Sequence, residues 1–558
     1  MTVSNGKSPG RKARARSRSN ASGAGRIGAR ATRERLLFDA LRGGRGSTIR
    51  ARDLRLALER VGLTDDDPRL RESLAALRRR TRAEADAELD LDSFGEIVRP
   101  GIPIIERALQ GLLVLPEFES FGAEVERIFE RVRDVRGGAV ADYIPQLGRV
   151  DPERYGVALV STDGQRLGLG DSTTPFCVQS TCKPVSYCLA LEEHGSDHVH
   201  RYIGCEPSGH SFNELTLNRE GRPHNPMINA GAIMSGSLIQ PGLTPADRFD
   251  HVLGMWRDLA GGARPSFSNA TYLSERGTAD RNFALGYFMR ENGAFPDGTD
   301  LVSALEFFFQ CCSIEMSAES MAMVAATLAN GGVCPTTGVQ VLRPDTVQKC
   351  LSLMVSCGMY DFSGEWAFSI GLPAKSGVSG AILVVVPGVL GLCVWSPRLD
   401  PQGNSVRGIE FCRQLVSTFH FHGYDHHGAA GKVDPRRRAS EALRDLGGDL
   451  CWAASEGDLD ALRRLAARGA ALDSADYDGR TPAHLAASEG QRVILEFLAD
   501  LGVPLDRTDR WGNTPLDDAR RGGHDAVAEL LQTWTNRPAE SAPGDAPGGA
   551  TGGEAAVA

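Results

Sequence analysis

Apolar residues recur at helical spacing through the first quarter of the chain. Leucine, valine and phenylalanine positions fall at intervals of three, four and seven residues, which places them on one face of a helix. The pattern predicts a small helical domain over residues 31–140. The stripes that carry it are Leu54, Leu58 and Val61; Leu70, Leu74 and Leu77; and Phe121, Val125, Ile128, Phe129 and Val132.

Two acidic segments give this domain an EF-hand-like look. They are Asp65-Asp66-Asp67 and Asp90-Leu91-Asp92. Neither has the central glycine and terminal glutamate that a calcium loop requires. We therefore expect an EF-hand-like helical domain without calcium loops.

Residues 141–425 mix strand and helix patterns. Runs at 157–160, 164–171 and 381–395 predict strands, and a Pro-Gly turn interrupts the last run. Helices are predicted from Ser180 to about Glu193 and near 244–260, 268–291, 300–311 and 317–330. Strands at both ends with helices between them predict an α+β domain.

A 33-residue period begins after a His/Gly/Arg-rich segment, 426–445, that has the composition of a linker. Ala453–Gly457 returns as Ala486–Gly490, and Thr481-Pro-Ala-His-Leu-Ala486 is close to the ankyrin signature. Residues 446–535 are predicted to hold about two and a half ankyrin repeats. The Gly/Ser/Arg-rich segment 1–30 and the Gly/Pro/Ala-rich segment 536–558 are predicted to be disordered tails.

Charge and composition exclude several classes of protein. The net charge of the chain is −9, yet residues 1–33 hold nine Lys or Arg and no acid. The rest of the chain is therefore acidic, which disfavours nucleic acid as a partner. No apolar run is long enough to cross a bilayer, so we expect no membrane association.

The compartment is predicted from the cysteines and the N-terminus. Twelve cysteines show no CxxC pair, which is typical of reduced thiols in the cytoplasm. The alternative is the mitochondrial matrix, if the basic segment 1–30 is a transit peptide. Histidines at 420, 422, 426 and 427 have no cysteine nearby, so we expect neither a metal nor another cofactor.

A serine and a lysine stand three residues apart in the run Phe176-Cys-Val-Gln-Ser180-Thr-Cys-Lys183. This spacing places both on one face of a helical turn, where a neutral amine can take the serine proton. Far downstream, Lys375-Ser376-Gly377 is similar to the K-T-G motif of class A β-lactamases and penicillin-binding proteins. Taken alone, Ser180 could equally be a helix N-cap.

Four further strings accompany the Ser-Lys run, and together they resemble the serine-dependent glutaminase family. The resemblance covers roughly 141–422 and extends to the layout of the kidney-type enzymes. It implies a multidomain chain: an α-helical N-terminal domain, an α+β serine β-lactamase-like catalytic domain and α-helical ankyrin repeats. The four strings are Pro223–Ala232, Ser274–Asn282, Cys357–Gly364 and Leu372–Gly380.

The resemblance implies hydrolysis of L-glutamine to L-glutamate and ammonia through a Ser-Lys acyl-enzyme. In this reading Ser180 is the nucleophile, Lys183 is its base, and Tyr360 relays a proton to the leaving ammonia. The backbone N–H groups of Ser180 and Val378 form the oxyanion hole. Lys183 must be partly neutral, so burial or a neighbouring cation has to lower its pKa, and Lys375 is the candidate neighbour.

Substrate-binding residues also follow from the resemblance. Glu275 is expected to receive the α-ammonium group, and Asn229, Asn282 and Tyr143 the rest of the substrate. Glu275 and Asn282 are seven residues apart, which predicts one shared helix face.

One position departs from the family pattern. Phe308 stands where the family usually has a tyrosine that contacts the substrate near the nucleophile. The ring is kept and the hydroxyl is lost. We expect an active enzyme that is slower or binds its substrate more weakly.

Two other functions remain open at this point. One is a different amidohydrolase of the same fold, acting on β-lactams or peptidoglycan. The other is an ankyrin-repeat scaffold with a weakened catalytic domain, for which Phe308 is the only sign. The family resemblance further implies a homotetramer and activation by phosphate, and the repeats could bind a protein partner.

Overall fold

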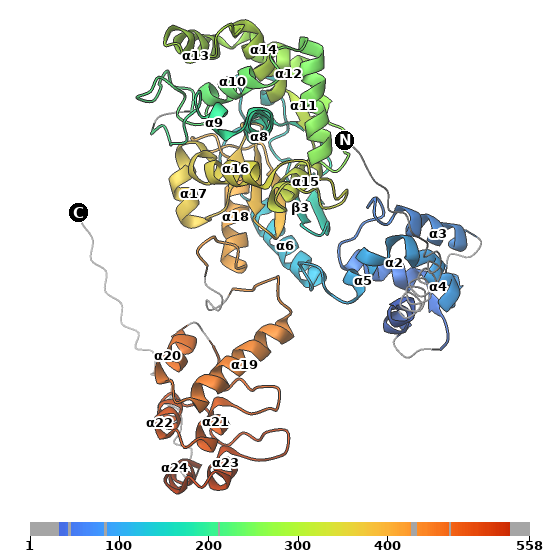
Figure 1. Cartoon of the computed structure of the whole chain (residues 1–558), viewed down its shortest axis with the longest axis vertical. Helices are drawn as coiled ribbons and strands as arrows, with labels where there is room; N and C mark the ends of the chain where they lie inside the picture. The colour runs from blue at the N-terminus through green and yellow to red at the C-terminus, as the bar shows by residue number, and fades with distance from the viewer. Residues whose placement is uncertain are drawn as a thin grey trace, which may run out of the picture. The chain divides into compact units, whose positions relative to one another are not determined.

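The computed structural model describes residues 33–42, 46–82, 86–209, 212–425, 432–467 and 470–535. These residues form two compact units (Figure 1). The first runs to Asp425 and includes Val433–Arg437, and the second begins at Arg438. The predicted tails at 1–30 and 536–558 lie outside the described residues. No helix within the described ranges is long and apolar enough to cross a membrane.

The first unit begins with a helical domain that includes one short antiparallel strand pair. Its leucine stripes are confirmed, because Leu54, Leu58, Leu74 and Leu77 are all buried in one core. The elements are a helix over 33–42, β1 (Ile49–Arg50), α2 (Ala51–Arg60), α3 (Arg71–Thr81), β2 (Glu88–Leu89), α4 (Leu91–Val98), η1 (Arg99–Gly101) and α5 (Ile102–Leu109).

The acidic segments of this domain serve local structure. Asp67 accepts hydrogen bonds from the Arg69 guanidinium at 2.6 Å. Asp90 caps α4 by accepting from the Ser93 N–H at 2.9 Å, which satisfies one of the free donors at a helix start. Across the described residues, no group of three or more His, Cys, Asp or Glu side chains could hold a metal ion.

A five-stranded antiparallel sheet forms the centre of the catalytic domain, in the order β4-β3-β10-β9-β8. Helices α6 and α18 cover one face, and α8 and α15 lie toward the other. Burial on both faces explains why the strands β9 and β10 are continuous apolar runs. The elements are α6 (Phe118–Arg133), β3 (Gly156–Ser161), β4 (Arg166–Gly170), α8 (Lys183–His194), α15 (Ala318–Ala329), β8 (Ala374–Ser376), β9 (Ala381–Val386), β10 (Leu390–Trp395) and α18 (Val406–Thr418).

Helix α6 belongs to a different domain from the one predicted. The pattern assigned it to the N-terminal helical domain, but its buried face packs on the sheet with α18. The N-terminal helices meet the catalytic domain at the β3–β4 turn. There Gln165 Nε2 donates to the carbonyls of Val61 at 3.0 Å and Leu115 at 2.9 Å, and Arg166 pairs with Asp66 at 2.6 Å.

Close packing of α15 on β10 requires a glycine. A side chain at Gly391 would collide with the backbone of Ala326 on α15. The helix can therefore approach the strand directly, as interiors packed to crystal-like density require.

A helical layer and a small three-stranded sheet, in the order β5-β7-β6, complete the first unit (Figure 1). The remaining elements are α7 (Pro145–Gly148), β5 (Phe176–Cys177), η2 (Gln179–Cys182), α9 (Ser196–Val199), α10 (Asn229–Leu238), α11 (Pro245–Leu259), β6 (Ser266–Phe267), α12 (Asn269–Gly277), α13 (Asp280–Glu291), α14 (Leu301–Cys312), β7 (Ile314–Met316), α16 (Pro344–Cys357), η3 (Tyr360–Phe362) and α17 (Ser363–Ser369).

Two helix predictions were wrong in detail. The helix expected over 268–291 is two helices, α12 and α13, because the chain leaves helical geometry at Thr278 and Ala279. The helix expected to open at Ser180 begins at Lys183. Ser180 lies in the preceding 3-10 turn, η2.

The second unit consists of three helix pairs. The pairs are α19 (Ala439–Ser455) with α20 (Leu459–Ala467), α21 (Pro482–Ser488) with α22 (Arg492–Asp500), and α23 (Pro515–Arg521) with α24 (Asp525–Thr535). The sequence predicted about two and a half repeats, which is fewer than these three helix pairs. Part of the first pair was missed because it lacks the Thr-Pro signature. Helix α19 begins within the predicted linker 426–445.

The Thr-Pro-x-His signature explains how neighbouring repeats are joined. The Thr481 N–H donates to His484 Nδ1 at 3.1 Å, which leaves Nε2 as the protonated nitrogen. That Nε2–H donates to the Asn513 carbonyl of the next repeat at 3.1 Å. One buried histidine thus caps its own helix and connects two repeats.

Candidate active site

Ser180 is held in a strained turn between β5 and α8. The residue before it, Gln179, has a φ of 48°, a left-handed conformation that is uncommon for non-glycine residues. Ser180 is only 8% exposed. Helix α14 and strands β8 and β9 all contact this turn, which fixes the serine at the meeting point of the sheet and the helical layer.

Lys183 is completely buried one turn after the serine. Its Nζ donates a hydrogen bond to Asn229 Oδ1 at 2.7 Å and lies 5.9 Å from the centre of the Phe212 ring. Burial lowers the pKa of Lys183 to about 8, because a charged amine is disfavoured away from water. A substantial fraction of the amine is therefore neutral near physiological pH and able to accept a proton.

Lys375 is a second buried amine, on β8. It donates to the carbonyls of Gly358 at 3.0 Å and Ser376 at 2.8 Å, and lies 4.4 Å from the centre of the Tyr360 ring. Burial, and after it the charge of Lys183, lowers the pKa of Lys375 well below its ordinary value. Burial, one of the two causes expected from the sequence, is the one that lowers the pKa of Lys183.

Tyr360 has its hydroxyl aimed at this cluster. Its φ of 54° is again left-handed, and the hydroxyl is buried without a hydrogen-bond partner among the described residues. Burial raises the pKa of Tyr360, and the nearby Ser180 opposes that rise. The Phe212 ring packs against Tyr360 with 4.9 Å between ring centres. The Tyr360 hydroxyl therefore lies close to Ser180.

A buried carboxylate lies on the other side of the serine turn. Glu275 Oε1 accepts hydrogen bonds from Tyr143 Oη at 2.6 Å and from Gln179 Nε2 at 3.0 Å. Burial raises the pKa of Glu275, and these two hydrogen bonds oppose the rise. The ring of Tyr143 is 49% exposed, so only its hydroxyl belongs to the enclosed part of the site.

Asn229 and Asn282 connect the carboxylate side of the site to the lysine. Asn229 accepts from Lys183 and donates through Nδ2 to Asn282 Oδ1 at 2.9 Å. Glu275 and Asn282 do not share one helix face as predicted, because they lie at the end of α12 and the start of α13.

Val378 lies in the turn that follows β8. A side chain on the preceding Gly377 would come within 3.0 Å of the Val178 carbonyl and 3.4 Å of the Thr181 N–H. The turn therefore lies directly against the serine turn. Backbone hydrogen bonds of this turn run from the Gly377 N–H to Ala381 and from the Gly380 N–H to Gly377. They leave the Val378 N–H available to an incoming oxygen.

Phe308 is buried in α14, the helix that packs on the serine turn. Its ring lies 5.8 Å from that of Phe309, centre to centre. One turn later, Cys312 Sγ lies 4.0 Å from Cys182 Sγ, between Ser180 and Lys183 in sequence. Phe308 is thus an apolar core residue of the helix that packs on the serine turn, and its side chain has no hydrogen-bonding group.

Two contacting residues were missed from the sequence. Gln179 donates to Glu275, and Phe212 covers both Lys183 and Tyr360. The position of Gln179 directly before Ser180 was a usable signal for the first. Nothing in the sequence marked Phe212, because its segment reaches the site only through tertiary folding.

The arrangement has the parts needed for acyl transfer. It combines a hydroxyl, a partly neutral amine, a second proton donor, and backbone donors at a short turn. Tyr360 and Phe212 line a cavity of about 550 Å³. A buried carboxylate and two amides lie on the opposite side of the serine turn.

Comparison with known families divides the chain into three matching regions. The sequence profile of the glutaminase family matches residues 138–424, that of ankyrin repeats (3 copies) matches 450–537, and an EF-hand domain profile matches 33–116.

Two relatives match most of the chain. The chain is 47% identical over 432 residues to the mitochondrial liver isoform of glutaminase from Rattus norvegicus, covering 77% of this chain and 72% of that protein. It is 48% identical over 442 residues to putative glutaminase 2 of Caenorhabditis elegans, covering 77% and 73%. Among solved structures, the probable glutaminase ybaS superposes with a TM-score of 0.52 at 35% identity, covering 55% of this chain and 98% of that one.

Proposed function

The chain belongs to the glutaminase family, and from that premise we propose that it hydrolyses L-glutamine to L-glutamate and ammonia through an acyl-enzyme formed on Ser180. The observation that carries this mechanism is the buried Lys183, whose pKa is lowered to about 8. A lysine that is charged at all working pH values could not activate a serine. A buried one beside a neutral amide can.

In the first half of the reaction, neutral Lys183 takes the Ser180 proton and Oγ attacks the side-chain amide carbon. The negative charge that forms on the amide oxygen is held by the N–H groups of Ser180 and Val378. The C–N bond then breaks. The departing nitrogen receives a proton through Tyr360 and leaves as ammonia, and a glutamyl ester remains on Ser180.

In the second half, water attacks the ester and loses its proton to the neutral amine of Lys183. Ser180 Oγ leaves, is reprotonated, and L-glutamate is released. No proton is gained or lost by the protein over the cycle.

Recognition of the amino-acid end follows from charge. Glu275 is a buried carboxylate without a basic partner among the described residues, and an α-ammonium group would neutralise it. Asn229 and Asn282 offer neutral amide donors for the α-carboxylate. Tyr143, whose hydroxyl donates to Glu275, holds that carboxylate in place. The substrate then lies between Glu275 and Ser180.

The direct test is ammonia release from L-glutamine by the full chain beside Ser180→Ala. We expect release by the native chain and a loss of about three orders of magnitude or more in the variant, as for nucleophile removal in other hydrolases. Ser352→Ala, at an exposed position on α16, serves as the control and should retain full activity. Equal release by Ser180→Ala would refute the mechanism.

The pH dependence of the reaction follows from Lys183. Protonation removes the base, so kcat/KM for L-glutamine should rise with pH and level off above about 8. Initial rates across about pH 6 to 9.5 measure this. A profile that is flat or falls over this range would contradict Lys183 as the base. Lys183→Arg should be inactive throughout, because arginine keeps its proton.

Phe308→Tyr tests the missing hydroxyl. If a polar group of the bound substrate or site is left unpaired, the variant should gain about 1–3 kcal/mol of transition-state binding, or roughly 5- to 150-fold in kcat/KM. Phe368→Tyr, at a position 87% exposed, is the matched control. No gain would mean that Phe308 is fully compatible with catalysis. An inactive native chain rescued by the substitution would favour the scaffold alternative.

For assembly and regulation, we propose a homotetramer activated by phosphate. Exposed Leu273, Tyr287 and Val302 on the catalytic helices support self-association. Exposed Tyr477 and Trp511, with Arg510 stacked on both rings, support a protein partner for the ankyrin repeats. Light scattering with and without phosphate tests the assembly, and a monomer unchanged by phosphate would overturn it.

For the compartment, we propose a reducing environment, either the cytoplasm or the mitochondrial matrix. All twelve cysteines are free thiols, which supports this choice. The rat and mouse relatives are named as mitochondrial. Imaging a fluorescent protein fused to residues 1–32 distinguishes the two, since only a transit peptide would carry it to mitochondria.

A further inference from the structure

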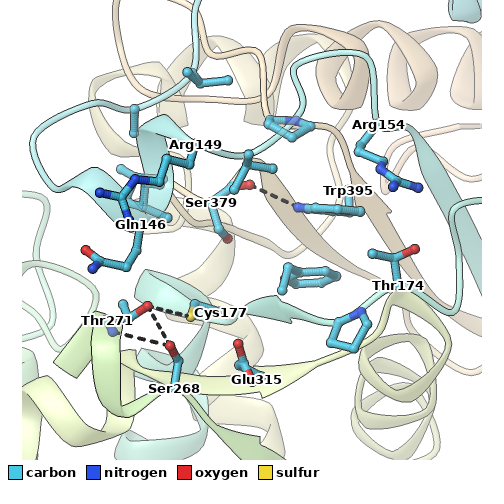
Figure 2. A pocket seen from close by; sticks show the side chains of 18 of the residues that line it. Gln146, Arg149, Arg154, Thr174, Cys177, Ser268, Thr271, Glu315, Ser379 and Trp395 are labelled. Atoms are coloured by element: carbon cyan, nitrogen blue, oxygen red, sulfur yellow. Dashed lines mark hydrogen bonds between the residues drawn. The ribbon is translucent and has the colours of Figure 1, made fainter.

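A second cavity, of about 440 Å³, is lined in part by Val378 and Ser379, in the turn that follows β8 (Figure 2). It is enclosed by the segment around α7, by β5 and β7, by the start of α12 and by the turn after β8. Val378 is the wall that it shares with the active site. Lys183, Asn229 and Glu275 do not line it, so it is separate from the expected glutamine site.

Two opposite charges line this cavity without an ion pair among the described residues. Arg149 is exposed, and the half-buried Glu315 carboxylate accepts a hydrogen bond from the Ser266 hydroxyl at 3.1 Å. The neighbouring Arg154 differs, because Asp171 pairs with it at 2.5 Å. Figure 2 shows Arg149 and Glu315 on opposite sides of the cavity. A ligand that carries one positive and one negative group would compensate both.

Two neutral polar atoms in the lining also lack partners. The Ser379 hydroxyl has no hydrogen-bond partner among the described residues, although the residue is only 7% exposed. The side-chain oxygen of Gln146 is buried and equally unpartnered. An unsatisfied buried polar group is destabilising. Such atoms in a cavity wall indicate a ligand with complementary donors and acceptors.

The remaining wall is apolar and flat. Trp395 stacks on Phe176 with 5.1 Å between ring centres and 16° between planes, and its indole N–H is already used by the Ser379 carbonyl at 3.0 Å. Both residues are buried, so this wall offers only apolar contact. A simple inorganic anion would leave this wall bare and would be repelled by Glu315.

We propose that this cavity binds a free α-amino acid with an apolar side chain. Its carboxylate meets Arg149 and the Ser379 hydroxyl, its ammonium group meets Glu315, and its side chain lies against the apolar wall that includes Phe176 and Trp395. Gln146 can satisfy either end through its amide. Binding here places a ligand directly behind the Val378 peptide without occupying the substrate site.

The test uses the full-length Ser180→Ala chain and isothermal titration with L-leucine. Saturable binding to one site is expected. Leucinamide, which lacks the carboxylate, and N-acetyl-L-leucine, which lacks the ammonium group, should each bind roughly tenfold more weakly or worse, as expected for the loss of a charged hydrogen bond. These comparisons use the same protein with three ligands, so a difference in affinity between them cannot come from misfolding of a variant.

Variants then locate the binding. Arg149→Gln and Glu315→Gln, each made in the Ser180→Ala chain, should each weaken L-leucine binding about tenfold. Arg264→Gln and Glu365→Gln, at exposed positions outside the cavity, should leave it unchanged. Circular dichroism checks that each variant is folded.

Three results would overturn the proposal. The first is no L-leucine binding by the folded chain. The second is binding unchanged by both Arg149→Gln and Glu315→Gln. The third is binding abolished by Glu275→Gln and displaced stoichiometrically by L-glutamine, which would place the ligand in the active site. None depends on turnover, so failure here is separable from failure of the proposed reaction.

Discussion

The chemistry of this chain depends on keeping the Lys183 amine out of water and away from carboxylates. Burial alone brings its pKa to about 8, and its hydrogen-bond acceptor is the neutral amide of Asn229. A carboxylate in that place would stabilise the charged amine and raise the pKa again. The one buried carboxylate of the site, Glu275, is instead bonded to Tyr143 and Gln179. Because Lys183 is bonded to an amide and Glu275 is bonded to other residues, the pKa of Lys183 stays low.

Burying two lysines requires a scaffold that excludes water from both directions. The sheet is covered on both faces, and α15 approaches β10 as closely as a glycine at 391 permits. The Lys375 amine donates hydrogen bonds to two backbone carbonyls and lies over the face of the Tyr360 ring. It thereby holds together the end of α16, the Tyr360 turn and β8. The strained φ angles at Gln179 and Tyr360 persist because this packing over-determines them.

How far the sequence predicts the site depends on how local the determining interactions are. The apolar strands β9 and β10, the helix stripes and the ankyrin period rest on short-range patterns and were predicted with nearly correct bounds. The joining of Ser180, Lys183, Tyr360 and Glu275 in one site came from family resemblance, since no periodicity connects them. The break between α12 and α13 escaped because Thr278 and Ala279 are unremarkable in sequence. The place of Phe212 over Lys183 and the unpaired Ser379 hydroxyl are tertiary effects.

The electrostatics also distinguish the substrate from the product. The side-chain amide of glutamine is neutral, so its arrival beside Ser180 leaves the pKa of Lys183 low. The γ-carboxylate of glutamate would bring a negative charge to the same place, raise that pKa and turn the base into a cation. At the other end, an α-ammonium group favours the ionised form of Glu275, against the effect of burial. Both ligands share that second interaction, so the discrimination arises at the lysine. Because burial lowers the pKa of Lys183 and its hydrogen-bond acceptor is a neutral amide, that pKa responds to the charge of the substrate group that the reaction changes.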